Sequence, residues 1–483
     1  MRSLQAQDFA DLEVIAVDDG STDGSGALLD ELARSEPRLT VIHQANAGLG
    51  AARNRGIAAS RGELLTFLDP DDLLPEGAYR RLVGALRASG SDLVVGAIER
   101  FEEDPAERWQ PRWSQVAHEQ ARSGVTIDDA PQALLDIVAC NRVVRREAWD
   151  RVVGRFPEGV VYEDHVPILR LYLEAGRFDV LHETTYLWRR RPDESSLAQQ
   201  KHELRNLQDR VLAKQHGREA VEAHGSAAVR RWYAARVLGV DLPPFLKGAV
   251  LADDQYWREA RGFATSFVAD AERDGEVWDL LEARQRVAAW LAAHDERAAL
   301  AALYARQEEH GASRLPVEVV AGEVLLSPGA WSAPGDAVPT VPQPLRRLSA
   351  RETGLRLVVT QVAVDGEDLV VTARVRLRQL GGLGPTTVRA ALVSQDGQVR
   401  VGSSATTLPG PDDEARFRLG LEQVRTAVED GGPLHLVAEA EVGGVRREAD
   451  RAETAMRGRL RGRGLELAPG LRAVRGGRGL LVA

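Results

Sequence analysis

The stretch DLEVIAVDDGSTDGS, residues 11–25, joins a short apolar run to a turn that carries several carboxylates. The apolar run predicts a strand, and the Gly- and Asp-rich segment after it predicts a turn into a helix. In open α/β sheets, ligands bind outside the carboxyl ends of the strands, so Asp18 and Asp19 could meet a ligand there. The alternative is a plain turn in which Ser21 or Thr22 caps the following helix. These residues alone leave both interpretations open.

Apolar runs continue to alternate with helical spacing up to about residue 100. This alternation is typical of βαβ units on a parallel sheet, so it predicts an α/β domain. The expected strands are residues 12–17, 39–43, 64–68 and 92–98, and the expected helices are 25–35, 49–60 and 75–89. Residues 128–188 mix helices with shorter strands, and we assign them to the same domain.

Beyond residue 198 the period of the apolar residues changes twice. Residues 199–314 have helical spacing almost throughout, which predicts a helical domain. After a proline-containing stretch at 327–344, the period becomes two, as in strands. Alternation is clearest at 369–377, 415–421 and 434–442, and turns are expected at Asp365-Gly366 and Asp396-Gly397. We therefore expect three domains, 1–198, 199–314 and 315–483, the last a β-sandwich of possible immunoglobulin-like topology.

Composition excludes several classes of protein. The net charge of −10 gives no cationic footprint for nucleic acid. A single cysteine, Cys140, excludes an internal disulfide framework and a zinc site built on cysteines. No stretch approaches the ~20 apolar residues of a membrane-spanning helix. We expect a cytoplasmic protein, and association with the inner face of the membrane and homo-oligomerisation both stay open.

A second acidic turn, FLDPDD at residues 67–72, also follows an apolar run. Its three carboxylates repel one another unless a cation lies among them, and hard oxygen ligands suit Mg²⁺ or Mn²⁺. We therefore predict a metal site at Asp69, Asp71 and Asp72. Such an ion would bridge a diphosphate and neutralise the charge that grows on the leaving group. The alternative is a solvated turn in which Asp72 caps the next helix.

A third acidic segment, YEDH at residues 162–165, precedes a run with helical spacing. Carboxylates at the start of a helix are stabilised by the helix dipole, so capping is one interpretation. The other is that one of them acts as a general base and takes a proton from an incoming hydroxyl. Spacing does not decide between the two. We expect His165 to be a neighbour of the acidic pair and not a metal ligand, and Cys140 to be a small buried residue.

Together these segments resemble the family 2 glycosyltransferases, which have the nucleotide-sugar-binding fold called GT-A. The resemblance runs from about residue 3 to 196. Besides the acidic turns, it is carried by NAGLGAARNRGIAASRG, CNRVVRREAWD, FPEG, YEDHVPILRLYLEAG and WRRRPDES. Their order and spacing agree with the family throughout.

The resemblance implies a nucleotide-sugar donor site. Asp19 would accept a hydrogen bond from the base of the donor, and Arg53 and Asn54 would help to hold the nucleotide. Asp69 and Asp71 would form the Asp-x-Asp pair that binds the diphosphate and a Mn²⁺ or Mg²⁺ ion, with Asp72 adjacent.

The resemblance also implies the acceptor side of the reaction. Asp164 corresponds to the general base, and Glu163 lies beside it in the acceptor site. Arg191 and Ser195 lie where relatives close a segment over the diphosphate. The implied reaction is a single in-line displacement with inversion at the anomeric carbon.

The chain departs from the family at its start. Relatives begin with an additional central strand, whereas Met1 here falls inside the helix that should follow it, so we expect a gap in the sheet. Buried main-chain groups without partners are costly. A second hypothesis is therefore a non-catalytic fragment that binds polysaccharide or partner proteins. Nucleotidyl transfer is a third, but the Gly-rich, basic phosphate loop that would favour it is not visible near the start of the sequence.

A helical stretch followed by a β-rich domain is similar in layout to bacterial enzymes that decorate cell-surface polymers, including wall teichoic acid glycosyltransferases. That similarity implies a cell-envelope, teichoic-acid or capsular acceptor, either a polymer or a lipid-linked precursor.

Overall fold

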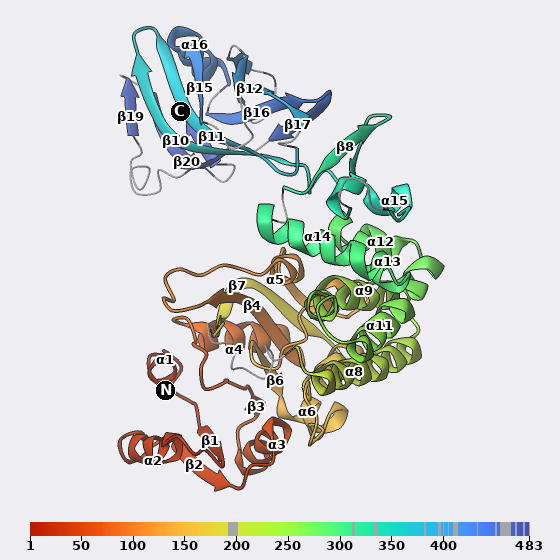
Figure 1. Ribbon diagram of the computed structural model, residues 1–483. Helices are drawn as coiled ribbons and strands as arrows, with labels where there is room; N and C mark the ends of the chain where they lie inside the picture. Colours follow the sequence, from red (N-terminus) through yellow and green to blue (C-terminus); the bar gives the residue numbers. More distant parts are fainter. Residues whose placement is uncertain are drawn as a thin grey trace. The chain divides into compact units, whose positions relative to one another are not determined.

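The computed structural model describes most of the chain and divides it into two compact units, Met1–Leu281 and Glu282–Ala483 (Figure 1). The described residues are 1–191, 201–311, 314–332, 337–380, 383–394, 398, 400–403, 405–408, 414–431, 433–449, 452–454, 465–468, 471–476 and 479–482. The predicted α/β class is confirmed. The division into three domains stays a prediction.

The first unit opens with a small parallel sheet of two strands. Strands β1 (Val14–Asp19) and β2 (Leu39–Gln44) pair in parallel and are joined by α2 (Ser25–Ser35). Helix α3 (Leu49–Ala59) follows and packs on β1. The helix predicted at 25–35 is confirmed residue for residue, and the predicted bounds of β1, β2 and α3 hold within two residues.

The second sheet of this unit has five strands and is mixed. Its order is β3 (Leu64–Leu65), β6 (Arg142–Arg145), β4 (Leu93–Phe101), β7 (Phe178–Arg189) and β5 (Arg122–Val125). Among the described neighbours in this sheet, only β4 and β7 pair in parallel, because β6 enters between β3 and β4 and is antiparallel to both. The expected parallel sheet thus contains antiparallel pairs as well as a parallel one. A strand inserted from a distant part of the chain leaves no trace in the local alternation of strands and helices.

Strand β3 is shorter than the predicted 64–68. After Leu65 the chain leaves the ladder, and Thr66 Oγ1 donates to the carbonyl oxygen of Arg142 at 2.8 Å. Phe67 packs its ring against Trp149 and Phe156, with centroids at 5.7 and 5.3 Å. The apolar run thus continues as a packed segment and not as a strand.

Among the described residues, β1 and β3 belong to different sheets, in line with the expected gap. Side chains make part of the connection. Glu13 Oε1 accepts from the amide nitrogens of Arg61 and Gly62 at 2.5 and 2.7 Å. Arg146 donates to the carbonyl oxygen of Gly62 at 2.7 Å. The small sheet is thereby tied to the segment that leads into β3.

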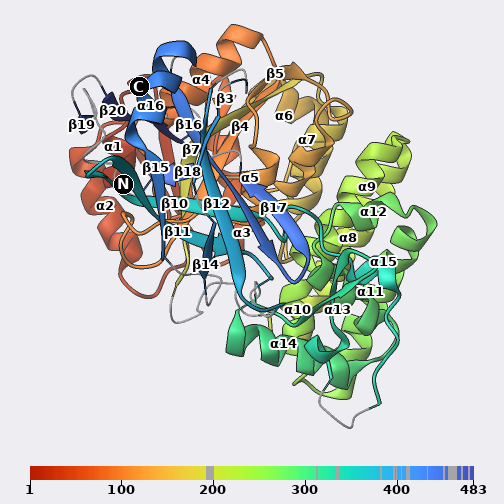
Figure 2. The same cartoon turned by 90° about the horizontal axis from the view of Figure 1, so that it is seen from above.

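Helices cover the five-stranded sheet and form the rest of the unit. Helix α4 (Ala78–Ser89) packs on β4 and β7, and α7 (His165–Glu174) packs on α8 (Leu204–His224). Helices α8, α9 (Ala227–Arg236) and α11 (Asp254–Arg273) lie side by side in both views (Figure 1, Figure 2). The other elements are α1 (Arg2–Gln5), α5 (Arg112–Ala117), the 3₁₀ turn η1 (Pro131–Leu135), α6 (Arg146–Val152), the π turn η2 (Val237–Asp241), α10 (Pro243–Ala249) and α12 (Glu276–Asp279).

The second unit begins with helices and continues as sheet. Its helices are α13 (Ala283–Ala293), α14 (Arg297–His310), η3 (Pro328–Ala330), α15 (Gln343–Arg346) and α16 (Leu421–Gly431). Its strands are β8 (Val317–Val320), β9 (Glu323–Leu326), β10 (Leu355–Asp365), β11 (Asp368–Leu377), β12 (Thr386–Val393), β13 (Arg400–Gly402), β14 (Thr406–Leu408), β15 (Glu414–Gly420), β16 (Leu434–Val442), β17 (Val445–Ala449), β18 (Ala452–Thr454), β19 (Leu465–Ala468), β20 (Leu471–Gly476) and β21 (Gly479–Val482).

The predicted alternation in the second unit is confirmed, with one correction. Strands β10 to β21 form one twelve-stranded sheet, and in β15 every second residue is buried. Leu421, which we expected in a strand, begins α16. The turn at Asp365-Gly366 joins β10 to β11, and Gly366 takes a φ of 62° there, which suits glycine. The turn predicted at residues 396–397 lies outside the described residues, and the immunoglobulin-like topology stays a prediction.

None of the helices in the described part of the chain combines the length and apolar character that crossing a membrane requires.

Candidate functional site

Arg53, on α3, joins two of the acidic turns. Its Nη1 donates to Glu163 Oε1, and its Nη2 donates to Asp69 Oδ1 at 3.0 Å. The Arg53 side chain is 8% exposed, and its guanidinium lies 5.7 and 5.4 Å from the ring centroids of Phe67 and Phe156. A buried cation of this kind compensates carboxylates that would otherwise repel each other. Three sequence motifs therefore meet at one side chain.

The beginning of α3 lies against the loop at residues 156–158. A Cβ added to Gly50 would come within 2.1 Å of the carbonyl oxygen of Pro157, so the two backbones touch. Asn54 fixes the same loop: its Nδ2 donates to Phe156 O at 3.0 Å and to Glu158 Oε1 at 2.8 Å, and its Oδ1 accepts from Phe156 N at 2.8 Å. Asn54 is buried and holds this loop, and its predicted nucleotide contact stays a prediction.

Asp19, at the end of β1, holds the loop that leads into α3. Its Oδ1 accepts from Gln44 Nε2 at 2.8 Å and from Ala47 N at 2.9 Å, and its Oδ2 accepts from Gly48 N at 2.8 Å. The carboxylate therefore shapes the loop directly before the helix that carries Arg53. Its predicted contact with the base of a donor is not tested by these bonds.

The neighbouring Asp18 pairs with His43 on β2. Asp18 Oδ2 lies 2.9 Å from His43 Nδ1, and His43 Nε2 lies 3.0 Å from Asp30 Oδ1. The hydrogen bond from Ser21, followed by that from His43, lowers the pKa of Asp18 to about 2. The two carboxylates in turn raise the pKa of His43. These contacts link β1, β2 and α2.

In the second acidic turn, Asp71 and Asp72 contact different partners. Asp71 Oδ2 accepts from Arg191 Nε at 2.8 Å. Asp72 is buried, and it accepts from Tyr186 Oη at 2.6 Å and from Arg189 N at 2.7 Å, both on β7. Burial raises the pKa of Asp72 to about 7, against the effect of those two hydrogen bonds. Asp72 therefore fastens the turn to β7, and its predicted place among the metal ligands stays a prediction.

The residues at this turn fit one mode of metal binding. Within the described ranges, no three His, Cys, Asp or Glu side chains gather to form a complete protein cage for a metal ion. Asp69 and Asp71 are the partly exposed carboxylates of the turn, with 36% and 23% of each side chain accessible. Mg²⁺ is commonly bound by one or two carboxylates together with substrate phosphates. The pair suits an ion that arrives with a diphosphate.

The third acidic turn presents Glu163 and Asp164 at the start of α7. Burial, followed by the charge of Asp164, raises the pKa of Glu163 to about 7, while Arg53 opposes the shift. Asp164 occupies the N-cap position of α7, but its side chain makes no capping hydrogen bond. Capping therefore does not account for Asp164. Burial opposes the charge of Arg53, but the charges around it, among them Asp69, Glu163 and Asp164, raise the pKa of its guanidinium.

Cys140 and His165, to which we assigned no role in catalysis or metal binding, are both buried. Cys140 Sγ lies 3.7 Å from Arg53 Nη2, and burial raises the pKa of the thiol. His165 turns away from the acidic pair into the core, where it meets Tyr233 Oη at 3.0 Å. Of the remaining predicted site residues, Arg191 contacts Asp71 as described above, and Ser195 lies outside the described residues. No pattern in the sequence pointed to Tyr186 or Tyr233.

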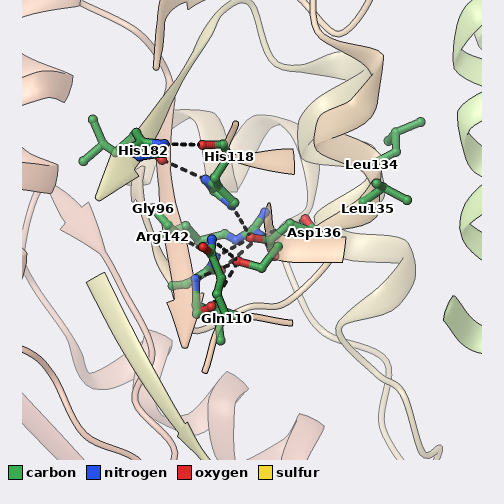
Figure 3. Close-up of polar contacts among 12 residues, drawn as sticks. Gly96, Gln110, His118, Leu134, Leu135, Asp136, Arg142 and His182 are labelled. Carbon is green, nitrogen blue, oxygen red and sulfur yellow. Dashed lines mark hydrogen bonds and ion pairs between the residues drawn. The ribbon is translucent and has the colours of Figure 1, made fainter. Parts of the chain in front are cut away.

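A network of buried polar side chains centres on Asp136 (Figure 3). Asp136 accepts from His118 Nε2 at 2.8 Å, from Asn141 Nδ2 at 2.5 Å and from Arg142 Nη2 at 3.1 Å. Burial alone would raise the pKa of Asp136, but His118 and Arg142 outweigh it and keep the pKa below its usual value. Because Thr66 donates to Arg142, the network supports the strand end that precedes Asp69.

Comparisons with known proteins match part of the chain to one family. Residues 1–153 match the family model described as glycosyl transferase family 2. The uncharacterized glycosyltransferase EpsJ of Bacillus subtilis is 30% identical over 194 residues, 40% of this chain and 56% of EpsJ. The minor teichoic acid biosynthesis protein GgaB of the same species is 25% identical over 195 residues, 40% of this chain and 21% of GgaB. The chain thus spans less than two thirds of either relative.

The similarity of fold extends further. The crystal structure of S. aureus TarS superposes with a TM-score of 0.57 at 15% identity and covers all of this chain and 81% of TarS. Both units therefore have counterparts in one solved structure.

Proposed function

We propose, on the premise that residues 1–153 form a family 2 glycosyltransferase domain, that the protein transfers a sugar from a nucleotide-diphosphate donor to a hydroxyl group of a cell-envelope polymer or its lipid-linked precursor. One observation carries the proposal. Arg53 contacts both Asp69 and Glu163, so the turn expected to hold the diphosphate and the turn expected to activate the acceptor share one buried cation.

The donor would lie along the ends of β1 and β3. Asp19 shapes the loop before α3, where the base would bind, and Arg191 beside Asp71 offers positive charge to the diphosphate. Asp69 and Asp71 would hold Mn²⁺ or Mg²⁺, which when bound supplies positive charge to the departing diphosphate. Arg53 donates to both Asp69 and Glu163 and so compensates the charges of the two carboxylates.

The acceptor would lie over the start of α7. Asp164 takes the proton of the acceptor hydroxyl, whose oxygen attacks the anomeric carbon as the bond from that carbon to the diphosphate oxygen breaks. Attack from the face opposite the leaving group inverts the anomeric centre. Glu163 stays paired with Arg53 and fixes the turn that presents Asp164. Proton removal by a positioned base commonly contributes ~10² to 10⁴ in rate.

The acceptor class rests on similarity alone. GgaB is named for minor teichoic acid biosynthesis, and the layout of both units follows that of TarS. We place the reaction in the cytoplasm at the inner face of the membrane, with the β-rich unit available for polymer binding or for self-association.

The test is donor turnover in the presence of Mn²⁺, with product configuration determined by NMR. Asp164→Asn should lower turnover by about 10³ and leave donor affinity unchanged. Asp71→Ala should raise the Mn²⁺ concentration needed for half-maximal rate. The matched control is Asp150→Asn, an exposed carboxylate on α6 that should change neither. Unchanged activity in both site variants would reject these roles, and a product that retains the donor configuration would reject inversion.

A second candidate is a non-catalytic protein that binds polysaccharide or partner proteins. The separation of the β1–β2 sheet from β3 favours it, because the expected donor site spans both sheets. Retention of the chain on immobilised polysaccharide, with neither binding nor turnover of any nucleotide sugar, would support this candidate over the transferase.

A further inference from the structure

Helix α8 contacts both residues that flank Glu163 and Asp164. On one side, Tyr162 Oη donates to Asn206 Oδ1 at 2.6 Å, and the Arg210 guanidinium stacks 3.4 Å from the centre of the Tyr162 ring. On the other side, Lys214 Nζ lies 3.0 Å from His165 Nδ1. Since residues four apart share one face of a helix, a single stripe of α8, at 206, 210 and 214, makes all three contacts.

Asp241, on the π turn η2, forms ion pairs with two residues of this stripe, Arg210 and Lys214. Its carboxylate lies 2.5 Å from Lys214 Nζ, 3.5 Å from Arg210 Nη1 and 3.1 Å from Arg236 Nε. Lys214 and Asp241 are buried, so each depends on the other for compensation of charge. Asp241 therefore fixes the two long side chains of α8 that reach the acidic turn.

The hydrogen bonds around His165 define its orientation. Tyr233 Oη donates to the carbonyl oxygen of Lys214 at 2.9 Å, so it can only accept from His165 Nε2. His165 Nδ1 is then left to accept from Lys214 Nζ. Burial and the nearby Lys214 lower the pKa of His165, which keeps the ring neutral, as this arrangement requires.

The backbone of the turn needs such support. Tyr162 takes a φ of 67°, in the left-handed region that a residue with a bulky side chain rarely adopts. Conformations of this kind persist where surrounding contacts determine them. Helix α8 also packs closely against Tyr233 and His165 at Gly217. A Cβ on Gly217 would lie 2.0 Å from Tyr233 Oη and 3.1 Å from His165 Nε2.

We propose that α8 is a positioning element of the transferase site, in which Asn206, Arg210 and Lys214 fix Tyr162 and His165 and thereby the direction of Glu163 and Asp164. This inference rests on the proposed function. It makes the helical segment after residue 204 part of the machinery that orients the general base, and Lys214 a positioning residue that never touches substrate.

The decisive variant is Lys214→Met, which removes the donor to His165 and one partner of Asp241. We expect kcat to fall ~10- to 100-fold, because a displacement of about 1 Å in a catalytic group costs this much, while the KM for donor changes less than ~twofold. The matched control is Arg218→Met on the same helix. Arg218 pairs with Asp270 on α11 at 2.8 Å and stacks 4.0 Å from the Phe267 ring, away from the acidic turn, so this variant should keep its kcat.

A milder pair of variants covers the case in which Lys214→Met does not fold. Asn206→Ala removes the acceptor for Tyr162 Oη and should lower kcat by ~3- to 10-fold. Asn206→Asp restores an acceptor at the same place and should recover most of that loss. A purely structural role for α8 would lower the melting temperature in these variants without separating kcat from KM.

Amide hydrogen exchange of residues 162–165 separates this inference from the proposed function. Lys214→Met should speed exchange at the turn, and Arg218→Met should not. If the unaltered protein turns over no nucleotide sugar, the transferase proposal fails whatever the exchange shows, and the positioning role fails with it. If the protein is active but Lys214→Met matches Arg218→Met in both kcat and exchange, only the positioning role of α8 is overturned.

Discussion

The two sheets of the first unit differ sharply in burial. Strand β4 buries six consecutive residues, 93–98, whereas β1 buries only Asp18 and α2 buries no residue. Apolar burial is the main source of stability, so the five-stranded sheet is the stable part of the unit. The candidate site uses both sheets: Asp19 ends β1 of the thinly covered sheet, whereas Asp69 follows β3 of the five-stranded sheet and is joined through Arg53 to the buried Glu163.

This difference in burial implies that different interactions hold the two sides of the site in place. On the five-stranded sheet, packing holds the carboxylates, and Arg53 adds the compensating charge. On the two-stranded sheet, backbone N–H groups that donate to the carboxylates of Asp18, Asp19 and Glu13 hold the loops in place. We therefore expect substitutions on the core side to lower both stability and rate, and those on the β1 side to affect donor binding with little loss of stability.

The largest effect is expected for Arg53→Met, which removes the cation shared by Asp69 and Glu163. Turnover should fall by about 10³. The free energy of unfolding should fall by ~3–5 kcal/mol, because carboxylates are left close together with their cation gone. Steady-state rates and urea denaturation measure the two quantities. Arg55→Met, an exposed neighbour on α3, should stay within ~0.5 kcal/mol of the unaltered protein. If both variants had the same turnover and the same free energy of unfolding, the proposed difference between the two sheets would be rejected.

The next effect concerns pH and Glu163. Its pKa is raised from 4.5 to about 7, so the stability that it contributes is fully present below pH 4.5 and is lost as the pH rises through about 7. The ion pair with Arg53 needs the carboxylate, so turnover should rise over the same interval. Relative to Glu163→Gln, the unaltered protein should lose on the order of 2 kcal/mol of unfolding free energy between about pH 5 and about pH 8.

Denaturation and rate profiles of both proteins provide the measurement. Stability and turnover that change in the same direction would contradict the assignment of the raised pKa to Glu163.

A smaller effect is expected for Gly50→Ala at the contact between α3 and the loop at 156–158. The new Cβ would meet Pro157 O at 2.1 Å and push the helix away, which should cost ~2 kcal/mol. Arg53 would move with the helix, so kcat should fall about tenfold. Gly56→Ala in the same helix is the control: its nearest neighbour would be Val17 Cγ2 at 3.7 Å, and helix propensity should stabilise it by ~0.5–1 kcal/mol. Similar losses in both variants would point to helix α3 itself and not to the loop contact.

The smallest effect on stability is expected on the β1 side, for Asp19→Asn. An amide has one oxygen, so it cannot accept from Gln44 and from both amides of the loop, and the loss should be ~1 kcal/mol. The KM for donor should rise about tenfold with kcat nearly unchanged. Asp30→Asn, which alters only the exposed contact to His43, should leave the KM unchanged. A drop in kcat at constant KM would show that Asp19 belongs with the catalytic side.

Local sequence predicted most helices and strands, and its errors are instructive. The helix at 25–35 and the alternation in β11, β15 and β16 were predictable because each follows one period of apolar residues. The strand expected at 64–68 ends at Leu65, because Phe67 continues the apolar run but packs on Trp149. Strand β6 was missed because its neighbours in the sheet come from far along the chain.

The candidate site divides in the same way. The acidic turns were visible in sequence because each places its carboxylates directly beside an apolar or helical run. The sequence also placed Arg53 in the site, through its resemblance to the glycosyltransferase family. It did not indicate that Arg53 pairs with a carboxylate 110 positions away, or that Asp72 faces Tyr186 on β7.

By itself, then, the sequence determined which segments are helix, strand or acidic turn, since these depend on periodicity and composition within about ten residues. The tertiary structure alone decided which carboxylates are buried, which share Arg53 and which helix steadies the turn at Glu163 and Asp164. Burial and charge pairing depend on neighbours brought together by the whole fold. In a turn, moreover, no repeating period fixes the direction in which a side chain points.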